Sequence, residues 1–150
     1  MARLCSASAK NNFMIKNLNI REIEFIAHSF ARETMSWHEP IPDFATRYPG
    51  KLESCLAVPF QKFSGRHLYR GLTGKAAILF YLMIKNHPFQ NGNKRLAVTT
   101  MLLLLHKNGQ WLTASNEILY RFSILIADSP AELKSEMISL IEGFLRKYLK

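Results

Sequence analysis

Nine consecutive residues carry the groups that phosphate chemistry needs. They run from His87 to Arg95 and read H-P-F-Q-N-G-N-K-R. A neutral histidine can take a proton from a hydroxyl group near neutral pH. Arg95 offers a forked donor for phosphate oxygens, Lys94 a compact positive charge and Asn93 an amide to orient a ligand. A proton acceptor and two cations in so short a segment predict phosphoryl or nucleotidyl transfer.

Local backbone preferences place this segment between two helices. Pro88 lacks an N–H group and disfavours the α conformation at the preceding residue, so a helix should end near Asn86 with His87 beyond it. We expect residues 91–93 to form turns, because asparagine and glycine tolerate positive φ, and a second helix to follow from Lys94. Unpaired N–H groups at the start of that helix would attract an anion. A structural histidine and a solvated helix start are the simpler interpretation of each part taken alone.

The same nine residues resemble the signature of the Fic and death-on-curing (Doc) superfamily, H-x-F-x-[D/E]-[G/A]-N-[G/K]-R. Eight of the nine positions fit, and Asn91 stands at the acidic one. Lys94 is typical of the Doc branch, whereas nucleotidylating Fic enzymes usually carry glycine there. Leu52 to Pro59 also looks like a segment of that branch, and the similarity covers roughly Ile20 to Trp111.

The resemblance implies an all-α fold, the Fic/Doc (Fido) helical fold, in which the signature loop joins two central helices. It also implies a short β-hairpin flap over the active site, which in family members pairs with an extended segment of the target. We expect this flap within Pro59 to Arg70, where the spacing of aromatic residues and glycines suits a hairpin. The expected target-binding residues are Pro59, Phe60, Gln61, Lys62 and Phe63.

The resemblance further implies a role for each residue of the loop. His87 matches the general base that takes a proton from a target hydroxyl, so that the oxygen can attack phosphorus. Phe89 matches the residue that anchors the loop in the core. The residues that match the nucleotide- and phosphate-binding positions are Gly92, Asn93, Lys94 and Arg95.

Asn91 departs from the family pattern at the metal-binding position. In active members an Asp or Glu there binds the Mg²⁺ that bridges nucleotide phosphates, because a hard cation prefers anionic oxygen. Asparagine keeps a carbonyl oxygen but loses the charge, so metal affinity should fall. The expected ligands are therefore ATP and, more weakly, Mg²⁺.

Three functions remain open. A Doc-like toxin would transfer phosphate from ATP to a serine or threonine hydroxyl of a translation factor, such as elongation factor Tu, and a cognate antitoxin would neutralise it. A Fic-type protein adenylyltransferase would transfer AMP (AMPylation), although Lys94 counts against it. A catalytically weak member would use the loop and the flap for binding, as Asn91 favours. The family's self-inhibitory motif, [S/T]-x-x-x-E-[G/N], has no full match, so restraint should come from a separate partner.

Composition limits the alternatives. A chain of 150 residues fits one domain, 1–150, and 48% hydrophobic with 21% charged residues argues against disorder. The longest apolar run, Ala76 to Ile84, is nine residues, far too short to span a membrane. Residues 1–9 lack the apolar core of a signal peptide, and Cys5 and Cys55 suggest no disulfide or metal site, so we expect a cytoplasmic protein.

The formal charge of +9 alone would allow nucleic-acid binding. The basic residues are scattered, however, with no run longer than Arg146-Lys147 and no zinc-finger or RNP-type spacing. A generally basic surface is the simpler interpretation.

Hydrophobic periodicity and capping signals predict helices along the rest of the chain. Residues 1–16 should be an irregular lead-in, and Asn19 with Glu22 has the spacing of a capping box. Residues 38–49 should form a surface loop. The expected helices run from Ile20 to about Trp37, Gly50 to Ala57, near Leu72 to Asn86, Lys94 to Leu105, Asn116 to about Ala127, and Pro130 to about Tyr148.

Several side chains near these elements are given structural roles. His28, His38, His67 and His106 form no cluster with zinc-ligand spacing. Trp111 is assigned to the core. Ser115 should cap the helix that follows it, and Ser129 with Glu132 should cap the last helix. The expected inner face of the last helix comprises Leu133, Met137, Leu140, Ile141, Phe144 and Leu145.

Overall fold

The computed structural model describes residues 14–34 and 40–150 of the chain. Most of the expected lead-in, with Cys5, lies outside the described residues. So do the expected end of the first helix at residues 35–37 and His38.

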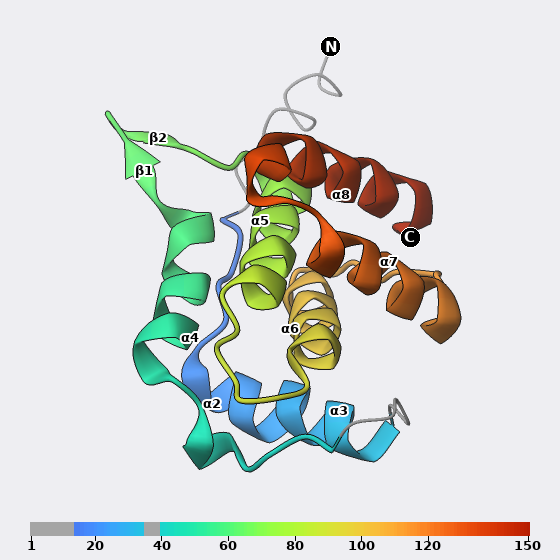
Figure 1. Cartoon of the computed structure of the whole chain (residues 1–150). Helices are drawn as coiled ribbons and strands as arrows, with labels where there is room; N and C mark the ends of the chain where they lie inside the picture. Colours follow the sequence, from blue (N-terminus) through green and yellow to red (C-terminus); the bar gives the residue numbers. More distant parts are fainter. Residues whose placement is uncertain (1–13, 35–39) are drawn as a thin grey trace.

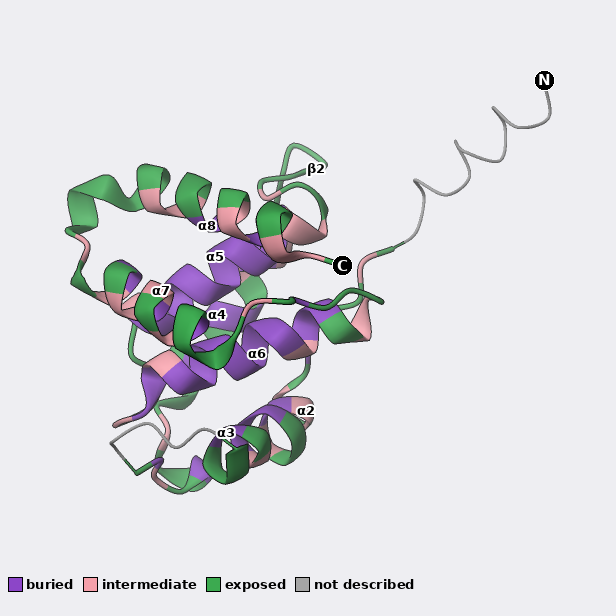
Figure 2. Cartoon of the chain, turned by 90° about the vertical axis from the view of Figure 1, so that its right-hand side faces the viewer, coloured by how far each residue is buried: buried purple, intermediate pink, exposed green. Residues whose placement is uncertain are grey.

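Two buried helices, α5 (Gly71–Lys85) and α6 (Asn93–Lys107), form the centre of the fold. α5 is buried continuously from Gly74 to Ile84, as its nearly all-round apolar sequence predicts. The two helices pack against each other, and the other elements cover them on the outside (Figures 1 and 2). Within the described part of the chain, no helix is both long and apolar enough to cross a membrane.

The first helical segment packs on α6 and consists of three parts: α2 (Ile20–Glu22), the π-helical turn η1 (Ile23–His28) and α3 (Ser29–Thr34). The capping box of Asn19 and Glu22 is present as predicted. The helix expected from Ile20 is present over its described part, with a π-helical middle at η1. The wider i→i+5 turn places Ile23, Ala27 and His28 on the buried side of the segment.

The connection to α5 contains α4 (Pro49–Ala57), the short 3₁₀ turns η2 (Phe44–Thr46) and η3 (Val58–Phe60), and a hairpin. Its strands β1 (Lys62–Phe63) and β2 (Arg66–His67) are antiparallel. Both turn residues between them have positive φ, which suits the twist of a tight hairpin. Pro59 and Phe60 are not part of the hairpin, because the fixed φ of Pro59 extends the helical turn after α4 instead.

The helices α7 (Asn116–Asp128) and α8 (Lys134–Tyr148) pack on α6 and α5, respectively. Ser115 caps α7 as predicted, by accepting a hydrogen bond from the Ile118 N–H. The prediction for the start of the last helix is wrong. The Ser129 hydroxyl donates back to the Ile126 carbonyl at the end of α7, and the 3₁₀ turn η4 (Ala131–Leu133) precedes α8.

Two other predictions of burial are wrong. Ile141 and Leu145 of α8 are buried, but Leu140 of the same helix and Leu133, which lies in η4, are exposed. Trp111 is 46% exposed and not in the core. Its backbone pairs with Lys150 at the end of the chain, and its ring packs edge-on against His106 at the surface.

Candidate active site

The loop between α5 and α6 has a strained backbone at its second residue, His87. α5 ends at Lys85, and His87 has a φ of 48°, in the left-handed region. Pro88 disfavours the right-handed α conformation at His87, and histidine is among the residue types that enter the left-handed region. Of residues 91–93, which we expect to form turns, Gly92 has a positive φ of 76°, whereas Asn93 is already the first residue of α6.

Two side chains hold the loop in shape. Phe89 is buried, as expected, and its ring lies 5.9 Å from that of Phe44. The Asn93 side chain closes the loop with two backbone hydrogen bonds. Its Oδ1 accepts the Phe89 N–H at 2.9 Å, and its Nδ2 donates to the Phe89 carbonyl at 2.8 Å. The amide that we expected to orient a ligand therefore fixes the loop in this structure.

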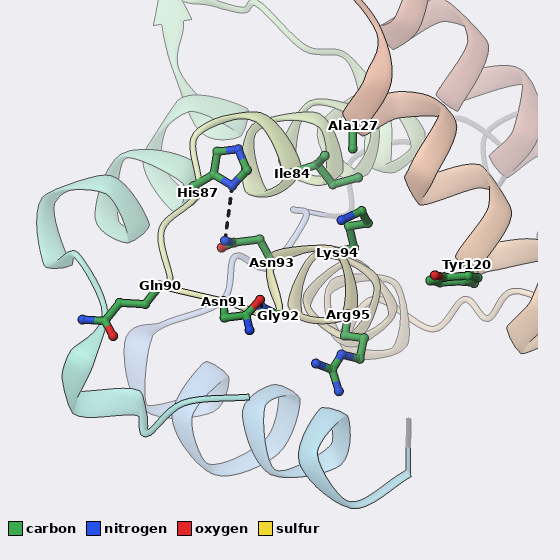
Figure 3. A pocket seen from close by; sticks show the side chains of 10 residues that line it. All are labelled: Ile84, His87, Gln90, Asn91, Gly92, Asn93, Lys94, Arg95, Tyr120 and Ala127. Carbon is green, nitrogen blue, oxygen red and sulfur yellow. Dashed lines mark hydrogen bonds between the residues drawn. The ribbon is translucent and has the colours of Figure 1, made fainter. Parts of the chain in front are cut away.

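The same amide orients the histidine. Nδ2 of Asn93 lies 3.4 Å from Nδ1 of His87, and the two side chains face each other across the loop (Figure 3). The bonds to Phe89 assign Nδ2 of the amide to this side, and an amide nitrogen can only donate. The contact therefore suits the neutral tautomer of His87 in which Nδ1 accepts and Nε2 carries the hydrogen.

The segment before α4 lies beside the loop. The Tyr48 N–H donates to the Pro88 carbonyl at 2.8 Å, and His28 Nε2 donates to the Pro42 carbonyl at 2.9 Å. A Cβ atom on Gly92 would come within 2.9 Å of the Ile41 side chain. Glycine is thus required at position 92 both for its φ and for this close approach.

A pocket of about 350 Å³ opens at the start of α6. His87 and residues 90–95 line it, so the structure brings together the loop residues expected to act in catalysis, phosphate binding and metal binding. Lys94 extends toward Ile84 and Ala127, whereas the largely buried Arg95 extends the opposite way (Figure 3). The two cations therefore do not converge on one point, and their phosphate-binding roles stay predictions.

The pocket is also lined by three residues that the sequence did not indicate. Ile84 belongs to α5, and Tyr120 and Ala127 belong to α7. The two α7 residues are more than 20 positions from the loop, and no local signal connects them with it. They reach the pocket because α7 packs on α6.

The pocket fits an anion better than a divalent cation. None of the described residues that line it is a carboxylate, and the described chain has no group of three or more His, Cys, Asp or Glu side chains that could hold a metal ion. Asn91 Oδ1 accepts the Gly92 N–H at 2.8 Å. The helix start and two cations favour negative charge, and Mg²⁺ requires hard anionic oxygens that these residues do not offer. The residues present do not fit a protein-borne Mg²⁺ site.

The hairpin does not cover this pocket. Its strands adjoin the N-terminal end of α5, whereas the pocket lies at the C-terminal end (Figure 1). Fifteen helical residues separate the two sites by about 22 Å along the axis. Of the expected flap residues, Lys62 and Phe63 form β1, but none of the five lines the pocket in the described structure.

A family model described as the Fic/DOC family matches residues 17–105, more than half of the chain, including the loop and most of both central helices. No curated protein and no solved structure matches the chain significantly.

Proposed function

The chain belongs to the Fic/DOC family, whose members typically transfer nucleotide or phosphate groups to proteins, and we propose that it transfers the γ-phosphate of ATP to a protein hydroxyl. The observation that supports this most is the pocket at the start of α6. It combines His87, two cations and the positive end of a long helix. Phosphoryl transfer depends mainly on positioning and on neutralising charge, and these groups can supply both.

In the proposed reaction, a serine or threonine hydroxyl gives its proton to His87 as its oxygen bonds to the γ-phosphorus. The bond from the γ-phosphorus to the β–γ bridging oxygen breaks, and ADP leaves. In the tautomer with the ring hydrogen on Nε2, the proton is taken at Nδ1, where the hydroxyl replaces the 3.4 Å contact with Asn93. Lys94 and the first N–H groups of α6 stabilise the phosphate oxygens.

Lys94 favours phosphate transfer over AMP transfer. It extends into the pocket where nucleotidylating relatives usually have glycine, so its charge is available to a terminal phosphate (Figure 3). By the same likeness to the Doc branch, we propose a cytoplasmic toxin. Its target would be a translation factor such as elongation factor Tu, and a separate antitoxin would restrain it.

Label transfer from ATP tests the reaction. The purified protein is incubated with bacterial lysate and ATP carrying the tracer at the α or the γ phosphate. Transfer of the γ label alone is the expected result, and transfer of the α label would replace the proposal with adenylylation. His87→Ala should abolish transfer, and so should His87→Asn, which tolerates the left-handed backbone better. His106→Ala, at an exposed histidine, should leave transfer unchanged.

A second candidate function is binding without catalysis. It is favoured by Asn91, whose side-chain oxygen accepts a backbone N–H in a pocket where no described residue offers a carboxylate. The Asn91→Asp variant separates the two functions in the same assay. Transfer by Asn91→Asp but not by the natural protein would mean that catalysis has been lost with the acidic residue. If neither protein transfers label, the result would favour a binding role.

A further inference from the structure

The sequence contains no Asp or Glu between Glu53 and Glu117, yet it has eight Lys and Arg residues in that stretch. Two of the eight, Lys94 and Arg95, line the pocket at the C-terminal end of α5. Four others come together at the opposite end of the same helix, although they are separated along the chain. This second group has no part in the proposed reaction.

These residues surround a cavity of about 840 Å³ between the hairpin, the start of α5 and residues 14–15. We call it the hairpin cavity. Its basic lining residues are Lys62, Arg66, His67, Arg70 and Lys75. None of the described residues that line it is acidic. Its other lining includes the apolar side chains of Met14, Ile15 and Phe60.

Lys75 is the most unusual of these residues because it is 2% exposed. Its Nζ donates to the Tyr69 carbonyl at 2.6 Å and lies 5.5 Å from the centre of the Phe60 ring. Across the described residues, no carboxylate forms an ion pair with it. Burial, with a contribution from nearby Lys62, lowers the pKa of Lys75. A buried charge without a counter-ion costs stability, so its presence calls for a function.

The start of α5 adds to the positive potential of the hairpin cavity. Arg70 is the N-cap residue, with extended backbone and no side-chain capping bond. Gly71 follows with a φ of 67°, and a Cβ atom there would meet no atom within 4 Å. The first N–H groups of a 15-residue helix are therefore approachable from this side.

We propose that the hairpin cavity binds a phosphate-bearing ligand with at least two negative charges. The charges of two lysines and two arginines would remain largely unneutralised beside a single carboxylate, whereas phosphate oxygens accept many charge-assisted hydrogen bonds. The cavity is larger than a phosphate group and matches the usual size of small-molecule sites, about 300–1,000 Å³. Phe60 and the apolar lining provide a surface for the organic part of the ligand. The proposal does not depend on the proposed phosphoryl transfer.

Titration calorimetry of the full chain with pyrophosphate, ATP and a ten-nucleotide DNA strand tests this site. The variant Arg66→Ala/Arg70→Ala should lose about tenfold or more in affinity for pyrophosphate, because each arginine can make charge-assisted hydrogen bonds. The matched control, Arg121→Ala/Arg146→Ala, removes the same charge from exposed residues on α7 and α8 and should change affinity less than about twofold. Lys94→Ala should leave this site intact while weakening the pocket at α6.

Equal losses in the two double variants would mean bulk attraction and would overturn the proposal, as would unchanged affinity in Arg66→Ala/Arg70→Ala. If the proposal holds, the relative affinities for ATP and for the DNA strand show which kind of phosphate-bearing ligand the cavity prefers. Tighter binding of ATP than of the strand points to a nucleotide, and tighter binding of the strand, with a steeper salt dependence, points to nucleic acid.

Lys75→Met separates binding from folding. Methionine has a similar length without the charge, so the unliganded variant should unfold at an equal or higher temperature than the natural protein. Its affinity for pyrophosphate should nevertheless fall by about tenfold. A lower unfolding temperature with unchanged affinity would show that Lys75 is structural and would overturn its place in the site.

Discussion

Gly92 allows the signature loop to pack against Ile41. A side chain at this position would meet two costs: a φ of 76°, and a contact of 2.9 Å with Ile41. Gly92→Ala should therefore lower the free energy of unfolding by about 2–5 kcal/mol, combining roughly 1–2 kcal/mol for the left-handed backbone with about 1–3 kcal/mol for overpacking. Urea unfolding measures this difference.

Gly109 provides the matched control for that measurement. Its φ is 81°, but a Cβ atom there would meet no atom within 4 Å. Gly109→Ala should cost only the backbone part, about 1–2 kcal/mol. Equal costs at the two positions would mean that Ile41 yields to the new methyl group and that the loop is not held by this contact.

For individual residues, the sequence predicted a loop whose residues line one pocket, but not the contacts within the loop. Residue types and spacing were sufficient to select His87 and the helix start beside it. The bonds from Asn93 to Phe89, and hence the orientation of His87, depend on how the loop closes in space. The burial of Lys75 was also unpredictable, because a lysine in a helix normally extends into solvent.

Among the elements, η1 is coupled to the segment before α4 and to the loop through one buried histidine. His28 donates to the Pro42 carbonyl, and its ring lies 5.5 Å from Phe44 and 6.1 Å from Phe89. Burial lowers the pKa of His28 from its usual value of 6.5, although the bond to Pro42 opposes this. Protonation of this ring therefore disfavours the folded state.

The lowered pKa predicts a pH dependence of stability. Below pH 6.5 the unfolded chain takes up a proton at His28 that the folded protein resists, so stability falls with decreasing pH until the folded protein also becomes protonated. His28→Gln, which can still donate to the Pro42 carbonyl, should reduce the loss of stability between pH 7 and pH 5. His106→Gln is the control at an exposed histidine. Chemical denaturation at pH 7 and pH 5 measures this loss of stability. An equal loss in the two variants would contradict its assignment to His28.

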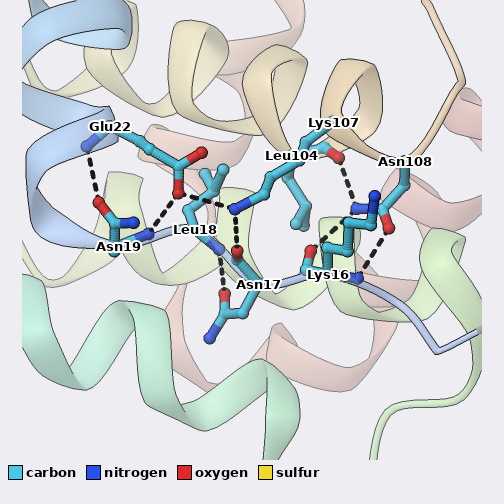
Figure 4. A network of polar contacts seen from close by, with 8 residues as sticks. All are labelled: Lys16, Asn17, Leu18, Asn19, Glu22, Leu104, Lys107 and Asn108. Atoms are coloured by element: carbon cyan, nitrogen blue, oxygen red, sulfur yellow. Dashed lines mark hydrogen bonds and ion pairs between the residues drawn. The ribbon is translucent and has the colours of Figure 1, made fainter.

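A polar network fixes the start of the described chain to the end of α6 (Figure 4). Lys107 Nζ donates to Glu22 Oε1 and to the Asn17 carbonyl, both at 2.8 Å. Asn108 exchanges hydrogen bonds with the backbone of Lys16. Burial acts to raise the pKa of Glu22, but hydrogen bonds from Lys107 and Asn19 outweigh it and lower the pKa. The network holds the first helical segment in place against α6.

Helix positions were more predictable than the arrangement of the connections. Apolar periodicity and caps located α4 to α7 to within two or three residues. The hairpin was expected in the right stretch but over the wrong end of α5, because its location depends on α4 and α5 running antiparallel. In the sequence, Ser129 and Pro130 matched the start of the last helix. In the structure, the Ser129 hydroxyl bonds to the Ile126 carbonyl and so belongs to the end of α7.

For the whole molecule, the uneven distribution of charge determines which ligands its two cavities can attract. Between Glu53 and Glu117 the chain has no acidic residue, and that stretch supplies the hairpin, α5, the loop and α6. The scattered basic residues indicated only a basic surface in the sequence. Folding gathers six of the eight Lys and Arg residues of this stretch in the two cavities, where they favour anions and disfavour a divalent cation.

This electrostatic setting predicts that ATP binding at the α6 pocket does not require Mg²⁺. With no carboxylate among the described lining residues, Mg²⁺ would reduce the negative charge of ATP without gaining an anionic protein ligand. In the Arg66→Ala/Arg70→Ala background, which weakens the hairpin cavity, ATP should bind at least as tightly in EDTA as with Mg²⁺. Adding Asn91→Asp should reverse this preference, and adding Lys94→Ala should weaken binding under both conditions. Calorimetry on the background variant that keeps Asn91 tests this. Tenfold tighter ATP binding with Mg²⁺ than in EDTA would show that asparagine is enough to bind the metal.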